Sequence, residues 1–321
     1  NENFTLNLKT FTGRAILKKE PEISILSNMK ILSSFCPNID INLRTSFKIA
    51  DGNVVLKELK IFDIASFVES SGKINYNSLL GEFLVSGKIL FKSLLKFFEI
   101  EGGTGELNIG GKITIIESEK WFEKLKLNLS FDGSFLLEEL MQILKVSEKL
   151  SGVAEINKGK VEGSLSSPVI SGKVSLSKGN ILGVKVDKVK AEALYRNGIL
   201  EFTEGNVNLY NGFAKARVWI TLPRVIKHHV SLELKGVSSN AVFELIKWNP
   251  KIAEGSVDGW LFSEGEKFSP SGAFTYTRKK MFPDDLRGEI SKIKGEFVSE
   301  NVIYKFNLLE IYLPEATVSA N

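Results

Sequence analysis

Residues 125–133 read LKLNLSFDG, alternating strictly between apolar and polar side chains before ending in an Asp-Gly pair. Successive side chains of a β-strand point to opposite faces of the sheet, so this period of two predicts a strand with one apolar and one polar face. Asp-Gly is a strong short-range signal for a tight hairpin turn. The segment therefore predicts antiparallel β-structure in which each strand is followed closely by the next.

The same alternation recurs along most of the chain. Further alternating runs are found in residues 39–49, 189–195, 230–234 and 302–308, and turn signals stand at Asp51-Gly52, Asp132-Gly133, Asn197-Gly198 and Asn211-Gly212. With strands of ordinary length, a chain of 321 residues holds about twenty or more of them. The predicted fold class is mostly β, built as an antiparallel meander.

Four segments switch to a helical period of apolar residues. They are residues 91–98, 137–144, 242–246 and 25–35, and we predict that each is a short amphipathic helix. A helix with one apolar stripe beside a sheet can cover an edge or an end of that sheet. It can also gate the entry of a ligand or dock on a membrane surface. Both interpretations stay open from the sequence.

The charge balance argues against a nucleic-acid ligand. Lys+Arg number 42 and Asp+Glu number 38, which gives a net charge of +4, and Lys and Glu alternate through the predicted strands. Nucleic-acid binders instead concentrate basic residues, with Arg favoured for bidentate phosphate contacts. The Lys and Glu excess beside a single glutamine, Gln142, also suggests a thermophilic source. We therefore predict solvated polar faces and no nucleic-acid partner.

The groups needed for catalysis or metal binding are scarce. Cys36 is the only cysteine, so neither an intrachain disulfide nor a cysteine metal site can form. His228 and His229 are the only histidines, and as neighbours on a strand they point to opposite faces. The glycine-rich segment 102–105 lacks the Gly-Lys-Ser/Thr of a phosphate-binding loop. We predict a non-enzymatic protein without catalytic residues, cofactor or metal.

The order of glycines and prolines suggests an internal repeat. One predicted helix is followed by Gly152, Gly163 and Ser167-Pro168, and another by Gly255, Gly265 and Ser269-Pro270. In both copies the proline lies five residues beyond the second glycine. We predict a single elongated domain over residues 1–321, with approximate repeat units 1–86, 87–132, 133–235 and 236–321. Chance similarity between glycine-rich β-segments is the alternative explanation.

The segment from Leu150 to Leu222 resembles the AsmA-like family of Gram-negative envelope proteins, which includes the TamB branch. The order of its features carries the resemblance: a strand ending in Ser-Pro, then LSKGNILGV (residues 176–184), then a Tyr-Arg-Asn-Gly hairpin and LYNGFAKARVWI (residues 209–220). Residues 237–276 carry a second copy, and residues 1–130 fit more weakly. The resemblance covers most of the chain through structural motifs.

The resemblance implies a long curled antiparallel sheet that forms an open, taco-like groove with an apolar inner face. It further implies a periplasmic protein that conducts phospholipid between the inner and outer membranes. An inner-membrane anchor would lie outside this segment, since the chain starts at Asn1 without a leader or anchor and reads as part of something longer. An outer-membrane protein is a further expected partner, although the C-terminal domain of the TamB branch is not seen before Asn321.

The alternating apolar residues are the candidate lipid-binding positions. They are Leu43, Phe47, Leu125, Leu127, Leu129, Val174, Leu176, Val189, Ala191, Ala193, Val218, Ile220, Val230, Leu232, Leu234, Tyr304 and Phe306. The same faces can instead meet each other in a closed β-sandwich. The alternative function is then a structural or interaction scaffold that assists outer-membrane protein assembly or envelope integrity.

Overall fold

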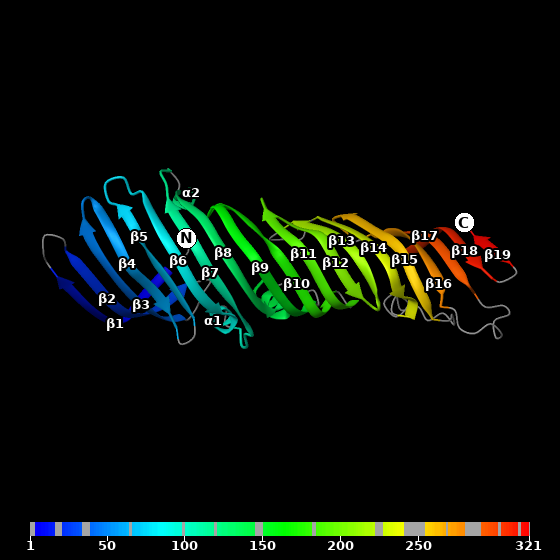
Figure 1. Cartoon of the computed structure of the whole chain (residues 1–321), viewed down its shortest axis with the longest axis horizontal. Helices are drawn as coiled ribbons and strands as arrows, with labels where there is room; N and C mark the ends of the chain where they lie inside the picture. Colours follow the sequence, from blue (N-terminus) through cyan, green and yellow to red (C-terminus); the bar gives the residue numbers. More distant parts are fainter. Residues whose placement is uncertain are drawn as a thin grey trace. The chain divides into compact units, whose positions relative to one another are not determined.

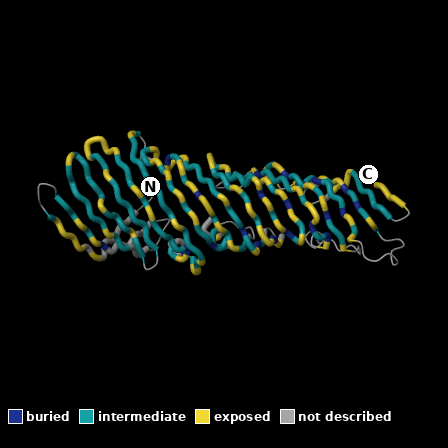
Figure 2. The backbone as a smooth tube through the Cα atoms, in the orientation of Figure 1, coloured by how far each residue is buried: buried dark blue, intermediate teal, exposed yellow. Residues whose placement is uncertain are grey.

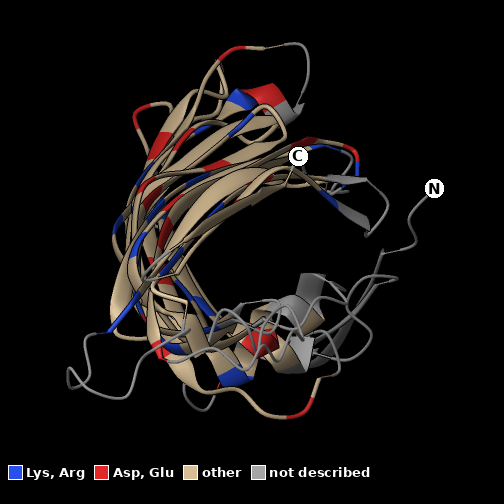
Figure 3. Cartoon of the chain, turned by 90° about the vertical axis from the view of Figure 1, so that its right-hand side faces the viewer, with Lys and Arg blue, Asp and Glu red and all other residues tan. Residues whose placement is uncertain are grey.

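A computed structural model of the chain gives the positions of most residues. It describes residues 4–16, 21–33, 39–63, 66–97, 100–118, 121–144, 150–181, 184–221, 227–240, 254–267, 269–279, 290–300, 303–313 and 316–320. These residues form one antiparallel sheet of 19 strands that does not close on itself (Figure 1). The strands are bent, so the sheet is curled rather than flat (Figure 3). The predicted fold class is therefore confirmed.

The chain divides into two compact units, residues 1–173 and 174–321, which we describe separately. In unit 1 each strand pairs with its neighbours in sequence. Its strands are β1 (Phe4–Ile16), β2 (Glu22–Ser33), β3 (Ile39–Ala50), β4 (Asn53–Phe62), β5 (Phe67–Asn75), β6 (Gly81–Leu90), β7 (Gly105–Ile115), β8 (Leu125–Leu136) and β9 (Leu150–Ser164). Its helices are α1 (Phe91–Phe97), α2 (Trp121–Lys124) and α3 (Leu137–Leu144). Because the boundary falls within β10 (Ser167–Ile181), the sheet continues from one unit into the other.

Unit 2 repeats the meander, and its regular elements within the described ranges are strands. Consecutive strands from β11 onward again pair antiparallel. They are β11 (Val184–Arg196), β12 (Ile199–Leu209), β13 (Gly212–Thr221), β14 (His228–Ser238), β15 (Gly255–Gly265), β16 (Ser271–Arg278), β17 (Lys292–Glu300), β18 (Ile303–Tyr312) and β19 (Thr317–Ala320). The predicted turns at Asp51-Gly52 and Asn197-Gly198 are confirmed.

The helix predicted for residues 25–35 is wrong, because Glu22–Ser33 forms strand β2. The pair Ile25 and Met29, four residues apart, fits a helix and equally fits the same face of a strand. Pairing decides between the two: Ile25 lies opposite Thr45 and Met29 opposite Ile41 in β3. The helix predicted at residues 242–246 lies outside the described residues, whereas the other two predicted helices correspond to α1 and α3.

The turn predicted at Asp132-Gly133 is also wrong, because both residues lie inside strand β8. A Cβ atom at Gly133 would lie 2.0 Å from the carbonyl oxygen of Glu106 on the neighbouring strand. The ladder between β8 and β9 also shifts its register between Phe131 and Gly133, which marks a bulge. Gly133 therefore serves a close approach of two strands within the bent sheet.

The best-buried cluster of unit 1 lies where α1 and α3 pack against the sheet. Phe91 and Leu95 of α1 are 2% and 0% exposed, and Phe135 of β8 is 7% exposed. The rings of Phe91 and Phe135 stack with centroids 4.9 Å apart. Leu140 of α3 packs against the same cluster. The two helices thus cover one end of one face of the unit 1 sheet, and helical ribbon lies on the concave side of the bend in Figure 3.

Unit 2 has its own buried cluster of Val257, Tyr276 and Ile293 on three consecutive strands. These residues face each other directly in the ladder, since Val257 pairs with Tyr276 and Tyr276 with Ile293. Elsewhere most side chains of the described strands are only half-buried or exposed, as the tube in Figure 2 shows. Each unit therefore combines a small packed cluster with a much larger sheet surface.

Candidate lipid-binding face

The strand register of unit 1 places the candidate residues on one common face. Directly paired residues of antiparallel strands project to the same side of a sheet. Leu43 pairs with Ile61, and Ile61 pairs with Val68, while Leu127 pairs with Ile113 across β7 and β8. Phe47, Leu125 and Leu129 lie on this face by strand alternation. We call this surface the unit 1 apolar face.

The register also adds residues that alternation in the sequence did not single out. Strands β6, β7 and β9 carry apolar side chains on the same face, namely Phe83, Val85, Ile89, Leu107, Ile109 and Val161. Glycines such as Gly87 and Gly111 interrupt their alternation, and this weakened the period-two signal in the sequence. The apolar pattern of β7, GELNIGGKITI, could still have identified that strand.

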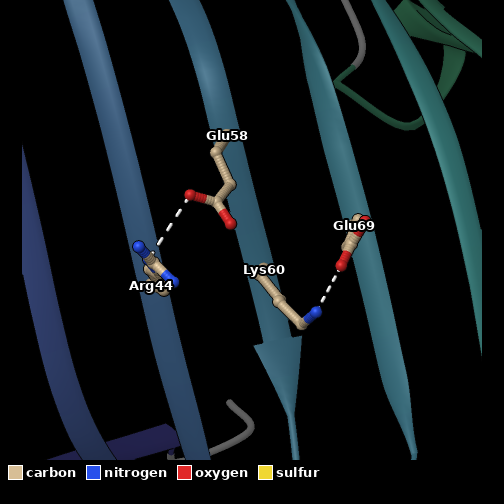
Figure 4. A network of polar contacts seen from close by, with 4 residues as sticks. All are labelled: Arg44, Glu58, Lys60 and Glu69. Atoms are coloured by element: carbon tan, nitrogen blue, oxygen red, sulfur yellow. Dashed lines mark hydrogen bonds and ion pairs between the residues drawn. The ribbon is translucent and has the colours of Figure 1, made fainter.

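The opposite face of unit 1 is polar and ion-paired. Arg44 Nε lies 3.4 Å from Glu58 Oε2, and Lys60 pairs with Glu69 on the next strand (Figure 4). Lys88 Nζ lies 2.6 Å from Glu106 Oε2 in the same way. These side chains are substantially exposed, so each pair adds only a few tenths to about 1 kcal/mol. The pairs identify the solvent-facing side of the sheet and leave the apolar face as the one to be covered.

Unit 2 shows the same separation of faces. Val218 pairs with Val230, Leu232 pairs with Leu261, and Val189 pairs with Val207. The candidates Ala191, Ala193, Ile220 and Leu234 lie on this unit 2 apolar face as well, and so does Phe306, which pairs with Phe297. The side chain of Tyr304 lies outside the described residues, although its backbone pairs with Ser299.

The two candidates in β10 differ from each other in burial. Val174 is half-buried, like most of the other candidates, whereas Leu176 is only 8% exposed. A side chain that is already packed cannot offer contact area to a ligand. The structure therefore places Leu176 in a packed position and Val174 in an accessible one.

The closed β-sandwich alternative is wrong for the part of the chain that the structure describes. A sandwich needs a second sheet packed about 10 Å from the first, which would bury the inner faces. The described strands form one sheet, and Leu127, Leu129, Val230 and Leu232 all stay half-buried. Both units thus carry an apolar face that no second sheet of the described residues covers.

Aromatic rings lie across glycines on these faces. A Cβ atom added at Gly159 would lie 2.7 Å from the ring of Phe131, and one added at Gly295 would lie 2.6 Å from the ring of Phe274. In both pairs the ring covers the backbone of the neighbouring strand, as in the aromatic rescue of strand glycines. The rings therefore lie low over the sheet, which keeps the apolar faces shallow at these points.

The glycine-rich loop before β7 holds a carboxylate of the protein itself. The N–H groups of Gly103 and Thr104 donate hydrogen bonds to the Glu139 carboxylate of α3 at 3.0–3.2 Å. The neighbouring Glu138 accepts the N–H of Gly152 at 3.0 Å. These contacts fix α3 over the end of the unit 1 apolar face, which favours the structural interpretation of the helix.

We expect the Glu139→Ala variant to lose about 1–2 kcal/mol of unfolding free energy, because two backbone N–H groups lose a charged acceptor. Urea denaturation followed by circular dichroism measures the change. Glu101→Ala removes the same charge from an exposed neighbouring position and serves as the control. Equal stability of the two variants would show that the loop does not depend on Glu139.

The two histidines lie on opposite faces, as predicted. His228 is 8% exposed, and its Nε2 atom lies 2.9 Å from Ser263 Oγ, which also accepts the N–H of Ser269. His229 projects from the other side, where its ring stacks on Trp219. Ser263 is only 1% exposed. The His228–Ser263 pair is thus a buried polar contact that closes a hairpin and is not exposed to a substrate.

The hairpin at Ser263 has a counterpart in unit 1. Ser164 is 5% exposed, and its Oγ atom accepts the N–H of Ser167, which precedes Pro168 just as Ser269 precedes Pro270. The first glycine of each copy is also held alike, since Gly152 donates to Glu138 and Gly255 donates to Ser239. The two segments that suggested a repeat therefore share hydrogen bonds as well as glycine and proline spacing.

Neither a metal site nor a known relative accompanies this face. Among the described residues, no group of three His, Cys, Asp or Glu side chains could hold a metal ion. None of the helices in the described ranges is long and apolar enough to cross a membrane. No protein-family model, curated protein or solved structure matches the chain.

Proposed function

We propose that the chain is a non-enzymatic lipid-transfer protein that holds the acyl chains of phospholipids along its apolar faces. The observation that carries the proposal is the uncovered apolar face in each unit, opposite a polar, solvent-facing side. Each CH₂ group removed from water contributes about 0.8 kcal/mol, so an extended acyl chain needs a continuous apolar surface and no specific polar site. Headgroups would remain in water beside the sheet.

The resemblance to the AsmA-like family extends this proposal to a setting. We propose a periplasmic location, an inner-membrane anchor outside this segment, and transport of phospholipid between the two membranes. An outer-membrane protein is the further partner proposed. These points rest on residues 150–222 and 237–276, whose order of strands and turns prompted the resemblance.

The alternative is a scaffold that meets proteins through its sheet. An open sheet ends in strands that can accept an added strand from a partner. The scaffold needs no accessible apolar face, whereas lipid carriage requires one. The half-buried Leu127 and Leu232 therefore favour lipid carriage over the scaffold.

Phospholipid that co-purifies with the chain provides the direct test. The protein would be purified without detergent, extracted with organic solvent and examined by mass spectrometry, with an unrelated closed β-sandwich as control. We expect phospholipid in stoichiometric amount, and uptake of a fluorescent phospholipid by delipidated protein. A chain that carries none and takes up none contradicts lipid carriage and supports the scaffold.

A further inference from the structure

The polar side of the unit 2 sheet carries aromatic residues, unlike that of unit 1. Trp219 pairs with His229 in the ladder, so both project away from Val218 and Val230 of the apolar face. Trp260 and Phe262 project to the same polar side from β15, because they alternate with Leu261. We call Trp219, His229, Trp260 and Phe262 the aromatic patch. Its position on the polar side separates it from the proposed lipid-binding face.

Part of this patch is held rigidly by its own contacts. The His229 ring stacks on Trp219 with centroids 5.9 Å apart and meets the edge of Phe262 at 5.2 Å. Its Nδ1 atom lies 3.6 Å from Glu264 Oε2. An aromatic surface that is ordered before binding loses little conformational entropy on association. The cluster can therefore serve as a preformed contact surface.

Trp260 is the exposed member of the patch, with 51% of its surface accessible. It pairs with Glu233 on one side and with Ala273 on the other, and Ala273 in turn pairs with Glu296. Glu233 and Glu296 are both exposed, and neither forms an ion pair with any residue in the described ranges. An exposed indole thus stands between two carboxylates that have no partner of opposite charge there.

A shallow trough runs beside Trp260 along β16. The β16 residues on this side are small, namely Ser271, Ala273 and Thr275, while the flanking strands present Trp260 and Glu296. The flanking strands are two strand spacings apart, about 9–10 Å. A trough of this width, parallel to the strands, suits one extended chain whose side chains reach both walls.

We propose that this surface binds an extended protein segment that carries Arg or Lys side chains. A cation over an indole face gains strength when a carboxylate beside it adds a charge-assisted hydrogen bond. The charge complementarity of Glu233 and Glu296 selects a cationic partner over an anionic one. The surface lies on the polar side, so binding here does not depend on the proposed lipid carriage.

The test uses the full chain and an acetylated eight-residue peptide of alternating Arg and Ser, with a Glu-Ser peptide of the same length as comparison. Calorimetry should detect binding of the Arg peptide only, weakening as salt increases. We expect Trp260→Ala to weaken binding about tenfold, as for an aromatic anchor. Leu84→Ala, which removes a 63% exposed side chain from the polar side of unit 1, should leave binding unchanged.

The carboxylates are tested separately from the indole. The double variant Glu233→Gln with Glu296→Gln should weaken binding of the Arg peptide, while Glu101→Gln with Glu117→Gln, both at exposed positions elsewhere, should not. Equal loss in both double variants would show general attraction to negative charge and would overturn the proposal. Absence of binding, or equal binding of the Glu peptide, would also overturn it. A dimer in sedimentation that disappears in Trp260→Ala would instead assign the patch to contacts between copies of this chain.

Discussion

The Leu232→Lys variant should lose most of its bound phospholipid while staying folded. Leu232 is half-buried in the middle of the unit 2 apolar face, paired with Ala216 and Leu261. An ammonium group at this position would have to lose water whenever an acyl chain covered it, and even about 1.4 kcal/mol of that cost lowers affinity about tenfold. We expect at least this loss in uptake of a fluorescent phospholipid.

The neighbouring Ser231 provides a matched control for this variant. Ser231 projects from the opposite, polar side of the same strand, so Ser231→Lys introduces the same charge one residue away. We expect Ser231→Lys to bind lipid normally. We also expect both variants to unfold within about 1 kcal/mol of the unchanged protein, because neither position is fully buried. If Leu232→Lys loses stability and lipid together, Leu232 belongs to the packed interior and the proposed face is wrong.

The Leu95→Ala variant should lose about 2–5 kcal/mol of unfolding free energy. Leu95 is 0% exposed between α1 and the sheet, beside Phe91 and Phe135. Truncating such a side chain removes its transfer free energy and leaves a cavity that the surrounding residues fill only in part. Urea denaturation measures the loss directly.

Leu84 is the control for this effect, because it is 63% exposed on the polar side of the same unit. We expect Leu84→Ala to change stability by no more than about 0.5 kcal/mol. A small effect of Leu95→Ala would mean that α1 does not hold the cluster together. In that case α1 would be free to move, and the gating interpretation of the helices would gain support over the structural one.

The polar side near the C-terminal end contains a cluster with shifted ionisation. A hydrogen bond from the Tyr312 hydroxyl, 2.6 Å from Glu310 Oε2, is the largest cause that lowers the pKa of Glu310, and the Lys294 charge contributes in the same direction. The pKa of Lys294 is raised, chiefly by its contact with Tyr312 and then by Glu310. Both groups lie on the solvent-facing side, so the cluster concerns the polar surface and not the lipid-binding face.

The strands and their two faces could be predicted because they depend on a local period. In residues 125–131 and 189–195, the alternation of apolar and polar residues is enough to assign each side chain to a face. The same alternation correctly predicted that His228 and His229 lie on opposite faces. The candidate residues on the apolar faces therefore came from the sequence with few omissions, and those omissions lie where glycines interrupt the alternation.

The errors arose where two distant segments meet. Ile25 and Met29 are compatible with a helix or a strand until β2 pairs with β3, and Gly133 fits a turn until Glu106 lies beside it. The glycine-rich loop at residues 102–105 resembles a ligand site, but Glu139 of the chain itself occupies it. In each case the deciding partner lies twelve or more residues away, beyond the reach of local pattern.

The sequence by itself determined that this chain is a β-meander with one apolar and one polar side to its strands, since side-chain alternation is a property of each strand alone. Only the tertiary structure decided which apolar residues are packed and which stay accessible. Leu95 and Leu176 are buried while Leu127 and Leu232 are not, although all four are leucines in apolar patterns. Burial depends on what covers a side chain, and that covering comes from segments distant in the sequence.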